Sequence, residues 1–197
     1  MFIQVIQGKI ADGDLLHRQD EAWLRDLKPG AKGFLGYTGG QTPDGRAIAM
    51  ARFESRAAAE ANSRRPEQSA WWNEAVKAYD GEPTFYDCDE VDTMFGGGSD
   101  DAGFVQIIEG RAKEQAALRS RVGEMEADLR KARPDILGMV VAWHGDGGGF
   151  TQAVYFKSET ESRKLEKETE SSEIRQDYMD QFVGQPTFFD LPEPVLD

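Results

Sequence analysis

Three side chains in the first half of the sequence, Asp20, Asn62 and Trp72, could together remove a proton from a flat molecule and hold the resulting anion. Asp20 falls on the apolar stripe of a predicted helix, where a carboxylate facing a cavity would have a raised pKa and could accept a proton. The Asn62 carboxamide can donate a hydrogen bond to the oxyanion that a phenol forms on losing its proton. The large ring of Trp72 can stack on a planar ligand. Each of these side chains could contribute to a pocket in the first half, Asn62 and Trp72 by positioning a ligand and Asp20 by contacting it.

The sequence contains the same unit twice, which provides an internal comparison. Residues 2–8 (FIQVIQG) return as residues 104–110 (FVQIIEG), 102 positions later. Residues 81–87 (GEPTFYD) return as residues 184–190 (GQPTFFD), 103 positions later. Two blocks at nearly one offset, at the start and end of each half, indicate a tandem duplication. Features that the copies share belong to the fold, and differences point to function.

Each copy has the pattern of a strand, a helix, two strands, a second helical region and a closing strand. In the first copy these are residues 2–7, 13–28, 34–38, 47–53, 55–79 and 83–87, with a helix break near Pro66. The second copy has apolar residues at the spacing of one helix face: Leu118, Val122, Met125 and Leu129. Its later elements are expected at 136–143, 150–156 and 158–182, without a proline.

The βαββαβ order predicts an α+β protein made of two ferredoxin-like repeats. Helices cover only one face of such a sheet, so the other face must be buried elsewhere. We therefore expect the two sheets to pack face to face into one pseudo-twofold α/β barrel within a single chain. The predicted repeats are residues 1–95 and 103–197, joined by a flexible Gly/Asp-rich linker at 96–102.

Gln4 and Gln106 are the same residue in both copies. Ile3 and Val5 form an apolar face that suits the helices, so Gln4 is expected to point the other way, into the space between the sheets. A buried amide needs a partner there. Gln4 would either pair with Gln106 across the pseudo-twofold axis or contact a ligand.

Arg52 shares a predicted strand face with Ile48 and Met50. It could hold a carboxylate or phenolate, or pair with a neighbouring acid at the strand end. Trp71 corresponds to Ile174 on an apolar stripe present in both copies. That position favours core packing, although the ring could also contact a substrate.

The three residues named first also have structural interpretations. Trp72 corresponds to Arg175 and could simply cover the helix break. Asn62, which corresponds to Leu165, could favour a fraying helix end. Asp20 corresponds to Val122, and a shift of one residue in the helix would place it in water.

Composition narrows the possible partners. The net charge of −13 disfavours nucleic acid and anionic membranes, and no basic stripe offsets it. The single cysteine, Cys88, excludes an internal disulfide and fits a reducing cytoplasm. No apolar run approaches the ~20 residues of a membrane span, and the chain starts with a strand-like segment instead of a signal peptide. Of the two histidines, His17 is expected to be solvated and His144 is expected to lie in a turn.

The first half resembles the dimeric α/β-barrel superfamily, and within it the antibiotic biosynthesis monooxygenase-like domains, at residues 51–55 (ARFES), 57–62 (AAAEAN), Pro66 and Trp71-Trp72. The second half keeps residues 156–158 (FKS) and loses the proline and both tryptophans. The resemblance implies a ligand between sheet and helices, with an asparagine and a tryptophan in this region holding the substrate oxygen. Relatives that bind haem use a histidine in the second helix. Residues 55–79 and 158–182 contain none, which counts against haem degradation.

We therefore predict a monooxygenase-like protein that uses O2 without a cofactor or metal on a phenolic or quinol-type small aromatic molecule. Asn62 and Trp72 would be catalytic, and substrate would contact the remaining candidates: Gln4, Arg52, Trp71 and Asp20. The protein would be a cytoplasmic monomer with an internal pseudo-dimer, or a homodimer. The alternative is a non-catalytic small-molecule-binding or structural barrel, and whether the protein is an enzyme stays open.

Overall fold

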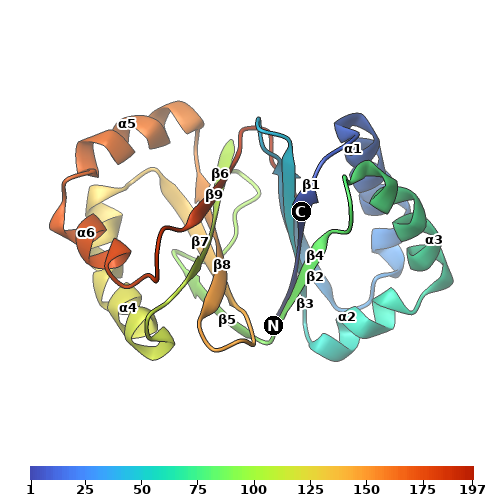
Figure 1. Ribbon diagram of the computed structural model, residues 1–197, viewed down its shortest axis with the longest axis horizontal. Coiled ribbons are helices and arrows are strands. Elements are labelled where there is room, and N and C mark those ends of the chain that lie inside the picture. Colours follow the sequence, from blue (N-terminus) through green and yellow to red (C-terminus); the bar gives the residue numbers. More distant parts are fainter. The chain divides into compact units, whose positions relative to one another are not determined.

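The computed structural model describes residues 1–197, except for the side chain of Ile174. The chain forms two compact units, Met1–Glu90 with Glu193–Asp197, and Val91–Pro192. Each unit has one five-stranded sheet with its helices on one face (Figure 1). The predicted α+β fold of two ferredoxin-like repeats is confirmed. Among the described residues, no helix combines the length and the apolar character needed to cross a membrane.

The first repeat follows the predicted order of elements. Its strands are β1 (Phe2–Lys9), β2 (Phe34–Gln41), β3 (Arg46–Phe53) and β4 (Thr84–Cys88). Its helices are α1 (Gly13–Ala22), a π-helical turn η1 (Trp23–Leu27), a 3-10 turn η2 (Lys28–Gly30), α2 (Arg56–Ser63), α3 (Pro66–Ala75) and a 3-10 turn η3 (Val76–Ala78).

The second repeat has the same order with more regular helices. Its strands are β6 (Phe104–Arg111), β7 (Ile136–Trp143), β8 (Gly149–Phe156) and β9 (Thr187–Leu191). Its helices are α4 (Gln115–Ala132), α5 (Glu159–Thr169) and α6 (Glu173–Met179). The first long helix is continuous here, whereas in the first repeat it ends in the π-helical turn, a feature often found at functional sites.

Each sheet contains a fifth strand that the sequence pattern did not predict. The strand orders are β10-β2-β3-β1-β4 and β5-β7-β8-β6-β9, where β5 is Glu90–Met94 and β10 is Val195–Leu196. The segment that follows β4 therefore lies in the sheet of the second repeat, and the segment that follows β9 lies in the sheet of the first. The compact units accordingly divide the chain differently from the predicted boundaries, at residues 91–95 and 193–197.

Two matching glycines make room for these edge segments. Gly36 and Gly138 each lie at a register shift in the second strand of their repeat. A Cβ atom at Gly36 would clash with the backbone oxygen of Asp197, and one at Gly138 with that of Gly97. Backbone can approach so closely only where a side chain is missing.

Local sequence explains where the helices begin. The Asp12 carboxylate accepts a hydrogen bond from the Leu15 backbone nitrogen at 2.8 Å and caps α1. Pro66 occupies the first turn of α3, as the predicted helix break requires. The second repeat breaks at the corresponding place without a proline, because Ser172 caps α6 instead.

The predicted faces of β1 are wrong. Phe2 packs with Ala59 of α2, and Gln4 lines a cavity beside the helices, so the face with Gln4 is the one that the helices cover. Ile3 and Val5 are fully buried on the opposite face. Apolar residues occupy both faces of this strand, and alternation alone cannot tell which face meets the helices.

Gln4 does not pair with its copy. Its Nε2 donates to Asp87 Oδ1 at 2.9 Å, and Gln106 Nε2 donates to Asp190 Oδ1 at the same distance. Each acceptor is the residue directly opposite on the neighbouring strand of the same sheet. The predicted glutamine pair is therefore wrong, and the shared glutamine joins the closing strand to the first one.

Candidate functional site

Each repeat contains a cavity between its sheet and its helices. In the first repeat the cavity is about 70 Å³ and is lined by Gln4, Ile6, Asp20, Trp23, Leu24, Phe34, Tyr37, Ala51, Phe53, Ala59, Asn62, Ser63, Gln68 and Trp71. Four of the six predicted site residues are among them: Gln4, Asp20, Asn62 and Trp71. These come from β1, α1, α2 and α3, so the fold brings together side chains that are far apart in the sequence.

Asp20 is the titratable group of this cavity. Burial raises the pKa of its carboxyl to about 7, and the positive charge of His17 and a hydrogen bond from the Tyr37 hydroxyl limit that rise. Burial and the nearby Asp20 also raise the pKa values of Tyr37 and Tyr79. Tyr37 therefore stays protonated and donates to Asp20, which changes its charge near neutral pH.

Aromatic rings wall the cavity on the helix side. Trp23 contacts Phe34 edge to face, with ring centroids 4.8 Å apart, and lies 6.5 Å from the Trp71 ring. Trp71 Nε1 donates to the Gln19 backbone oxygen at 2.8 Å, which fixes its ring. Such rings provide flat apolar surface beside the carboxylate of Asp20.

Asn62 is buried and held by a polar network. Its Nδ2 donates to Gln68 Oε1 at 3.3 Å, and its Oδ1 accepts from Arg65 at 2.7 Å. Trp23 Nε1 donates to the same Gln68 oxygen at 2.7 Å. The Asn62 amide nitrogen carries two hydrogens, and the bond to Gln68 uses one of them. Asn62 therefore has a fixed orientation and is built into the wall of the cavity, beside Trp23.

Two predicted site residues lie outside this cavity. The Trp72 ring contacts Phe85 edge to face at 5.4 Å between centroids and lies 6.4 Å from the Tyr79 ring. Successive helical residues are about 100° apart around the axis, so Trp72 cannot point where Trp71 points. Trp72 is not a lining residue of this cavity, and its stacking on a ligand stays a prediction.

Arg52 points away from the cavity, on the sheet face that carries Ile48 and Met50, as the alternation predicted. Its guanidinium donates to Thr38 Oγ1 at 3.0 Å and to the Asp197 backbone oxygen at 2.8 Å. These bonds tie Arg52 to the edge strand. Neither of these two bonds is to an acidic side chain, and both predicted roles of Arg52 stay predictions.

Sequence reasoning missed Tyr37 and Gln68. A signal for Tyr37 was present, because its counterpart Met139 is apolar, just as Asp20 has the apolar counterpart Val122. Comparing both positions would have found the pair. Gln68 gave no such signal, because it gains its role only when α3 packs beside Trp23. The predicted match between Trp71 and Ile174 lies outside the described residues, because the structure does not describe the Ile174 side chain.

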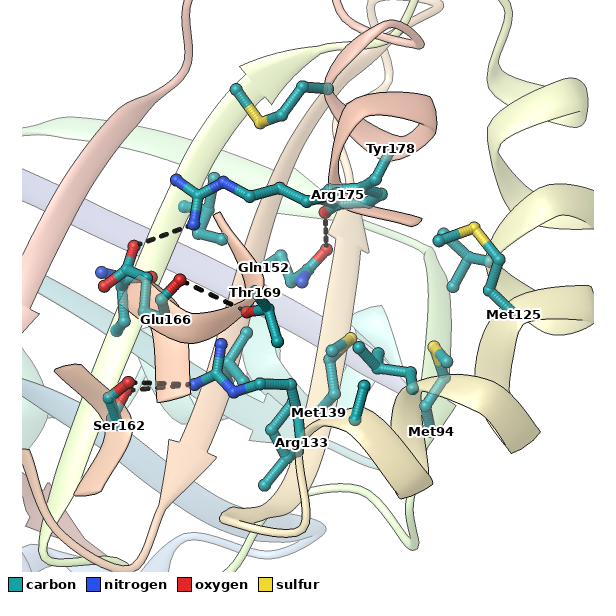
Figure 2. Close-up of a pocket in the computed structure, with 18 of the residues that line it drawn as sticks. Met94, Met125, Arg133, Met139, Gln152, Ser162, Glu166, Thr169, Arg175 and Tyr178 are labelled. Atoms are coloured by element: carbon teal, nitrogen blue, oxygen red, sulfur yellow. Dashed lines mark hydrogen bonds and ion pairs between the residues drawn. The ribbon is translucent and has the colours of Figure 1, made fainter. Parts of the chain in front are cut away.

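The cavity of the second repeat is larger, about 150 Å³, and mainly apolar (Figure 2). Four methionines lie on it: Met94, Met125, Met139 and Met179. Val122 and Met139 take the places of Asp20 and Tyr37, so no carboxylate equivalent to Asp20 is present. Glu166 is the acidic side chain on this cavity among the described residues, and it is paired with Arg175 at 3.3 Å.

Neither histidine is a lining residue of these two cavities. His17 lies 3.5 Å from Glu21 on the exposed side of α1. His144 is buried directly before the turn at residues 145–147, and one of its ring nitrogens lies 2.9 Å from Thr151 Oγ1. Burial lowers the pKa of His144. In the described part of the chain, no three His, Cys, Asp or Glu side chains group as a metal site would require.

The chain is thus an α+β protein of two ferredoxin-like repeats, each with a cavity between its sheet and its helices. No protein-family model matches the sequence, and no curated protein matches it either. Solved structures with the same fold include a "putative monooxygenase" from Lactobacillus acidophilus, with 15% identity, TM-score 0.70, and coverage of 99% of this chain and 93% of that one.

Two further structures extend this likeness over nearly the whole chain. A Fusobacterium nucleatum protein, also described as a "putative monooxygenase", is 9% identical with a TM-score of 0.71, covering 96% of this chain and 90% of that one. An anthrone oxidase-like protein is 9% identical with a TM-score of 0.63, and the match covers 99% of this chain and 93% of that one. The resemblance predicted from the sequence is thereby confirmed at the level of the fold.

Proposed function

We propose that the first repeat contains a cofactor-independent oxygenase site for phenolic or quinol-type aromatic molecules, with Asp20 as the general base. One observation carries the proposal: a carboxyl group with a pKa of about 7 lies in an aromatic-walled cavity and is hydrogen-bonded by Tyr37. A base with this pKa is half ionised at neutral pH, where proton transfer is most effective. The second repeat has no equivalent.

The reaction would begin with transfer of a proton from the substrate to Asp20. For an anthrone-type substrate, the resulting carbanion is delocalised over the ring system and can react with O2 directly. The methylene carbon loses two hydrogens and gains one oxygen atom, and the other oxygen atom leaves as water. The carbon centre is oxidised by four electrons and O2 is reduced by four, so no further reductant is required.

The other residues would position the substrate. The rings of Trp23 and Trp71 provide flat surface, and the second Nδ2 hydrogen of Asn62 is a donor for a substrate oxygen. At about 70 Å³ the cavity is roughly half the volume that holds a benzene ring, so it admits the reacting edge of a substrate. Leu24 is partly exposed and is a lining side chain that can move to admit the remainder.

The solved structures with this fold include two that are described as monooxygenases and one that is described as anthrone oxidase-like. These likenesses support the fold alone, and a fold hosts many activities. The choice of reaction therefore depends on Asp20 and its surroundings.

Oxygen consumption tests the proposal. The purified protein is given an anthrone or a hydroquinone in an oxygen electrode, beside Asp20→Asn and the neighbouring surface variant Glu21→Gln. We expect Asp20→Asn to lose about 10²- to 10⁴-fold of the rate, the usual contribution of a general base, and Glu21→Gln to lose none. Equal rates in the wild type and Asp20→Asn would reject Asp20 as the base.

A non-catalytic binding protein is the second candidate, favoured by the larger and base-free cavity of the second repeat. Two of the four tryptophans, Trp23 and Trp71, line the cavity of the first repeat. Quenching of their fluorescence by the same compounds, without oxygen uptake above the spontaneous rate, would establish binding and reject the enzyme.

A further inference from the structure

The second repeat contains an unpartnered hydrogen-bond donor inside its apolar cavity. Tyr178 donates its hydroxyl hydrogen to Gln152 Oε1 at 2.7 Å. Gln152 is only 4% exposed, and among the described residues its Nε2 group has no acceptor. Figure 2 shows the Gln152 oxygen turned toward Tyr178 and the nitrogen turned away from it.

This donor opens onto the cavity. No fully enclosed side-chain nitrogen or oxygen of the described residues lacks a partner, so the Gln152 nitrogen must be reachable from open space. Gln152 lines this cavity and also a second cavity of about 160 Å³ in the same repeat, which shares Met94 and Val122 with it. A buried amide hydrogen without an acceptor costs free energy, and a ligand oxygen in the cavity would recover it. Its counterpart in the first repeat is Ala49, so the donor belongs to the second repeat alone.

The charges around the cavity favour an uncharged ligand. Arg133 forms two bonds to the buried Asp135 carboxylate, at 2.9 and 2.7 Å. Glu166 lies between Arg175, at 3.3 Å, and Arg163, at 3.1 Å. Each charge therefore already has a counter-charge. An ionic ligand would have to break one of these pairs, whereas a neutral ligand leaves them intact.

Size and lining point to a single aromatic ring. A cavity of about 150 Å³ lined by apolar side chains is large enough to hold benzene. Met125 and Met139 lie on it, and thioethers adapt to the outline of an aromatic ring and contact its edge favourably. Gln152 would then donate a hydrogen bond to one oxygen atom attached to that ring.

We propose that the second repeat is a binding site for neutral single-ring aromatic carbonyl compounds, held by the methionine-lined cavity and by a hydrogen bond from Gln152. The site has no base and is separate from the oxygenase site proposed for the first repeat. It stands whether or not that site is catalytic.

Methionine methyl NMR can locate the ligand, because four of the six methionines line this cavity and Met1 and Met50 do not. The protein, labelled with ¹³C at its methionine methyl groups, is titrated with acetophenone, ethylbenzene and benzoate. We expect acetophenone to shift Met94, Met125, Met139 and Met179 and to leave Met1 and Met50 in place. Acetophenone should bind about tenfold more tightly than ethylbenzene, the effect of one hydrogen bond. Benzoate should bind more weakly than either.

Two variants test the mechanism of recognition. The double variant Gln152→Leu, Tyr178→Phe removes donor and partner together, and should abolish the tenfold preference while ethylbenzene binding changes less than twofold. Val122→Phe places a ring inside the cavity and should weaken both compounds at least tenfold. The same substitution at the exposed Val183 should weaken neither.

Three results would overturn the proposal. The first is an absence of methionine shifts at millimolar acetophenone, which would make the cavity a packing void. The second is binding of benzoate as tight as that of acetophenone. The third is a preference for the ketone that survives in the double variant.

Discussion

Asp20 and Tyr37 in the first repeat correspond to Val122 and Met139 in the second. Both pairs lie on the same two elements, the first long helix and the second strand, and both line a cavity under the helices. One cavity is small and contains a titratable carboxyl. The other is about twice as large, rich in methionine, and contains an amide donor instead. Duplication has kept the scaffold and let the two interiors diverge in chemistry.

The comparison also shows how little change such divergence needs. Gln4 and Gln106 make the same bond to an aspartate in each repeat, and Gly36 and Gly138 accommodate an edge segment in each. Asp20, Tyr37 and their counterparts are side chains that line the cavities, where a substitution does not disturb the sheet.

The largest effect on stability is expected from Asp20→Asn. The pKa of Asp20 rises from 3.8 to about 7 on folding, so the folded state favours the protonated form. The stability that this proton binding contributes is fully present below pH 3.8 and is lost as the pH rises through about 7. A shift of about three units corresponds to about 4 kcal/mol, so Asp20→Asn should raise the free energy of unfolding by up to about 4 kcal/mol at pH 8.

Urea denaturation at pH 3.5, 6 and 8 measures this effect through the tryptophans of the first repeat. Asp20→Asn and the wild type should be alike at pH 3.5 and diverge above pH 6. Glu21→Gln, at an exposed neighbour, is the control and should follow the wild type throughout. A stability difference that does not change with pH would contradict the raised pKa.

The reverse change, Val122→Asp, places a carboxylate in the second cavity without a tyrosine partner. We expect it to destabilise the second unit by about 3 kcal/mol at pH 8 and by less at low pH, because burial opposes ionisation. The neutral variant Val122→Asn should cost less and show no dependence on pH. Trp143 fluorescence reports on this unit. If both variants behave alike at every pH, the second cavity is better hydrated than its lining indicates.

Removal of residues 193–197 should weaken the first sheet and not the second. Tyr37 and Asp197 exchange two backbone hydrogen bonds, at 2.7 and 3.0 Å, and Arg52 donates to the same segment. We expect a loss of about 2 kcal/mol. Amide hydrogen exchange should become faster along β2 and stay unchanged along β7. Equal changes in both strands would mean that the segment stabilises the chain as a whole.

Tyr37→Phe should shift the pH dependence of the proposed reaction. The Tyr37 hydroxyl donates to the Asp20 carboxylate and lowers its pKa. Without that bond the pKa rises further, by about one unit for a bond of about 1 kcal/mol, and the midpoint of oxygen uptake moves to higher pH. The pH profile of uptake measures it, with Met139→Leu in the second repeat as the control. If the midpoint does not move, the Tyr37 hydroxyl does not influence the pKa of the group that limits oxygen uptake.

The smallest effect is expected at Trp72. Its ring packs on Phe85 and Tyr79 and does not line the cavity, so Trp72→Phe should change oxygen uptake less than twofold. Trp71→Phe, on the adjacent residue, removes part of the cavity wall and should lower uptake several-fold. If the two variants behaved in the opposite way, the reacting molecule would lie against Trp72, outside this cavity.

The sequence by itself determined the repeat, the order of elements and the fold. Hydrophobic periodicity and turn residues are local signals, and the second copy repeats them, so the prediction of two ferredoxin-like units did not depend on distant contacts. The apolar stripe of the first helix likewise placed Asp20 among residues that face the interior. Its raised pKa follows from that position and from burial.

Only the tertiary structure decided which residues meet. The face of β1 that the helices cover could not be inferred, because both faces are apolar and alternation is symmetric between them. Trp71 and Trp72 differ by one residue, and only the packing of α3 shows that the first lines the cavity. The edge strands β5 and β10 are too short to give a pattern, and their pairing depends on backbone that approaches Gly36 and Gly138. Periodicity specifies elements, whereas a site is made by contacts between elements, and those depend on packing.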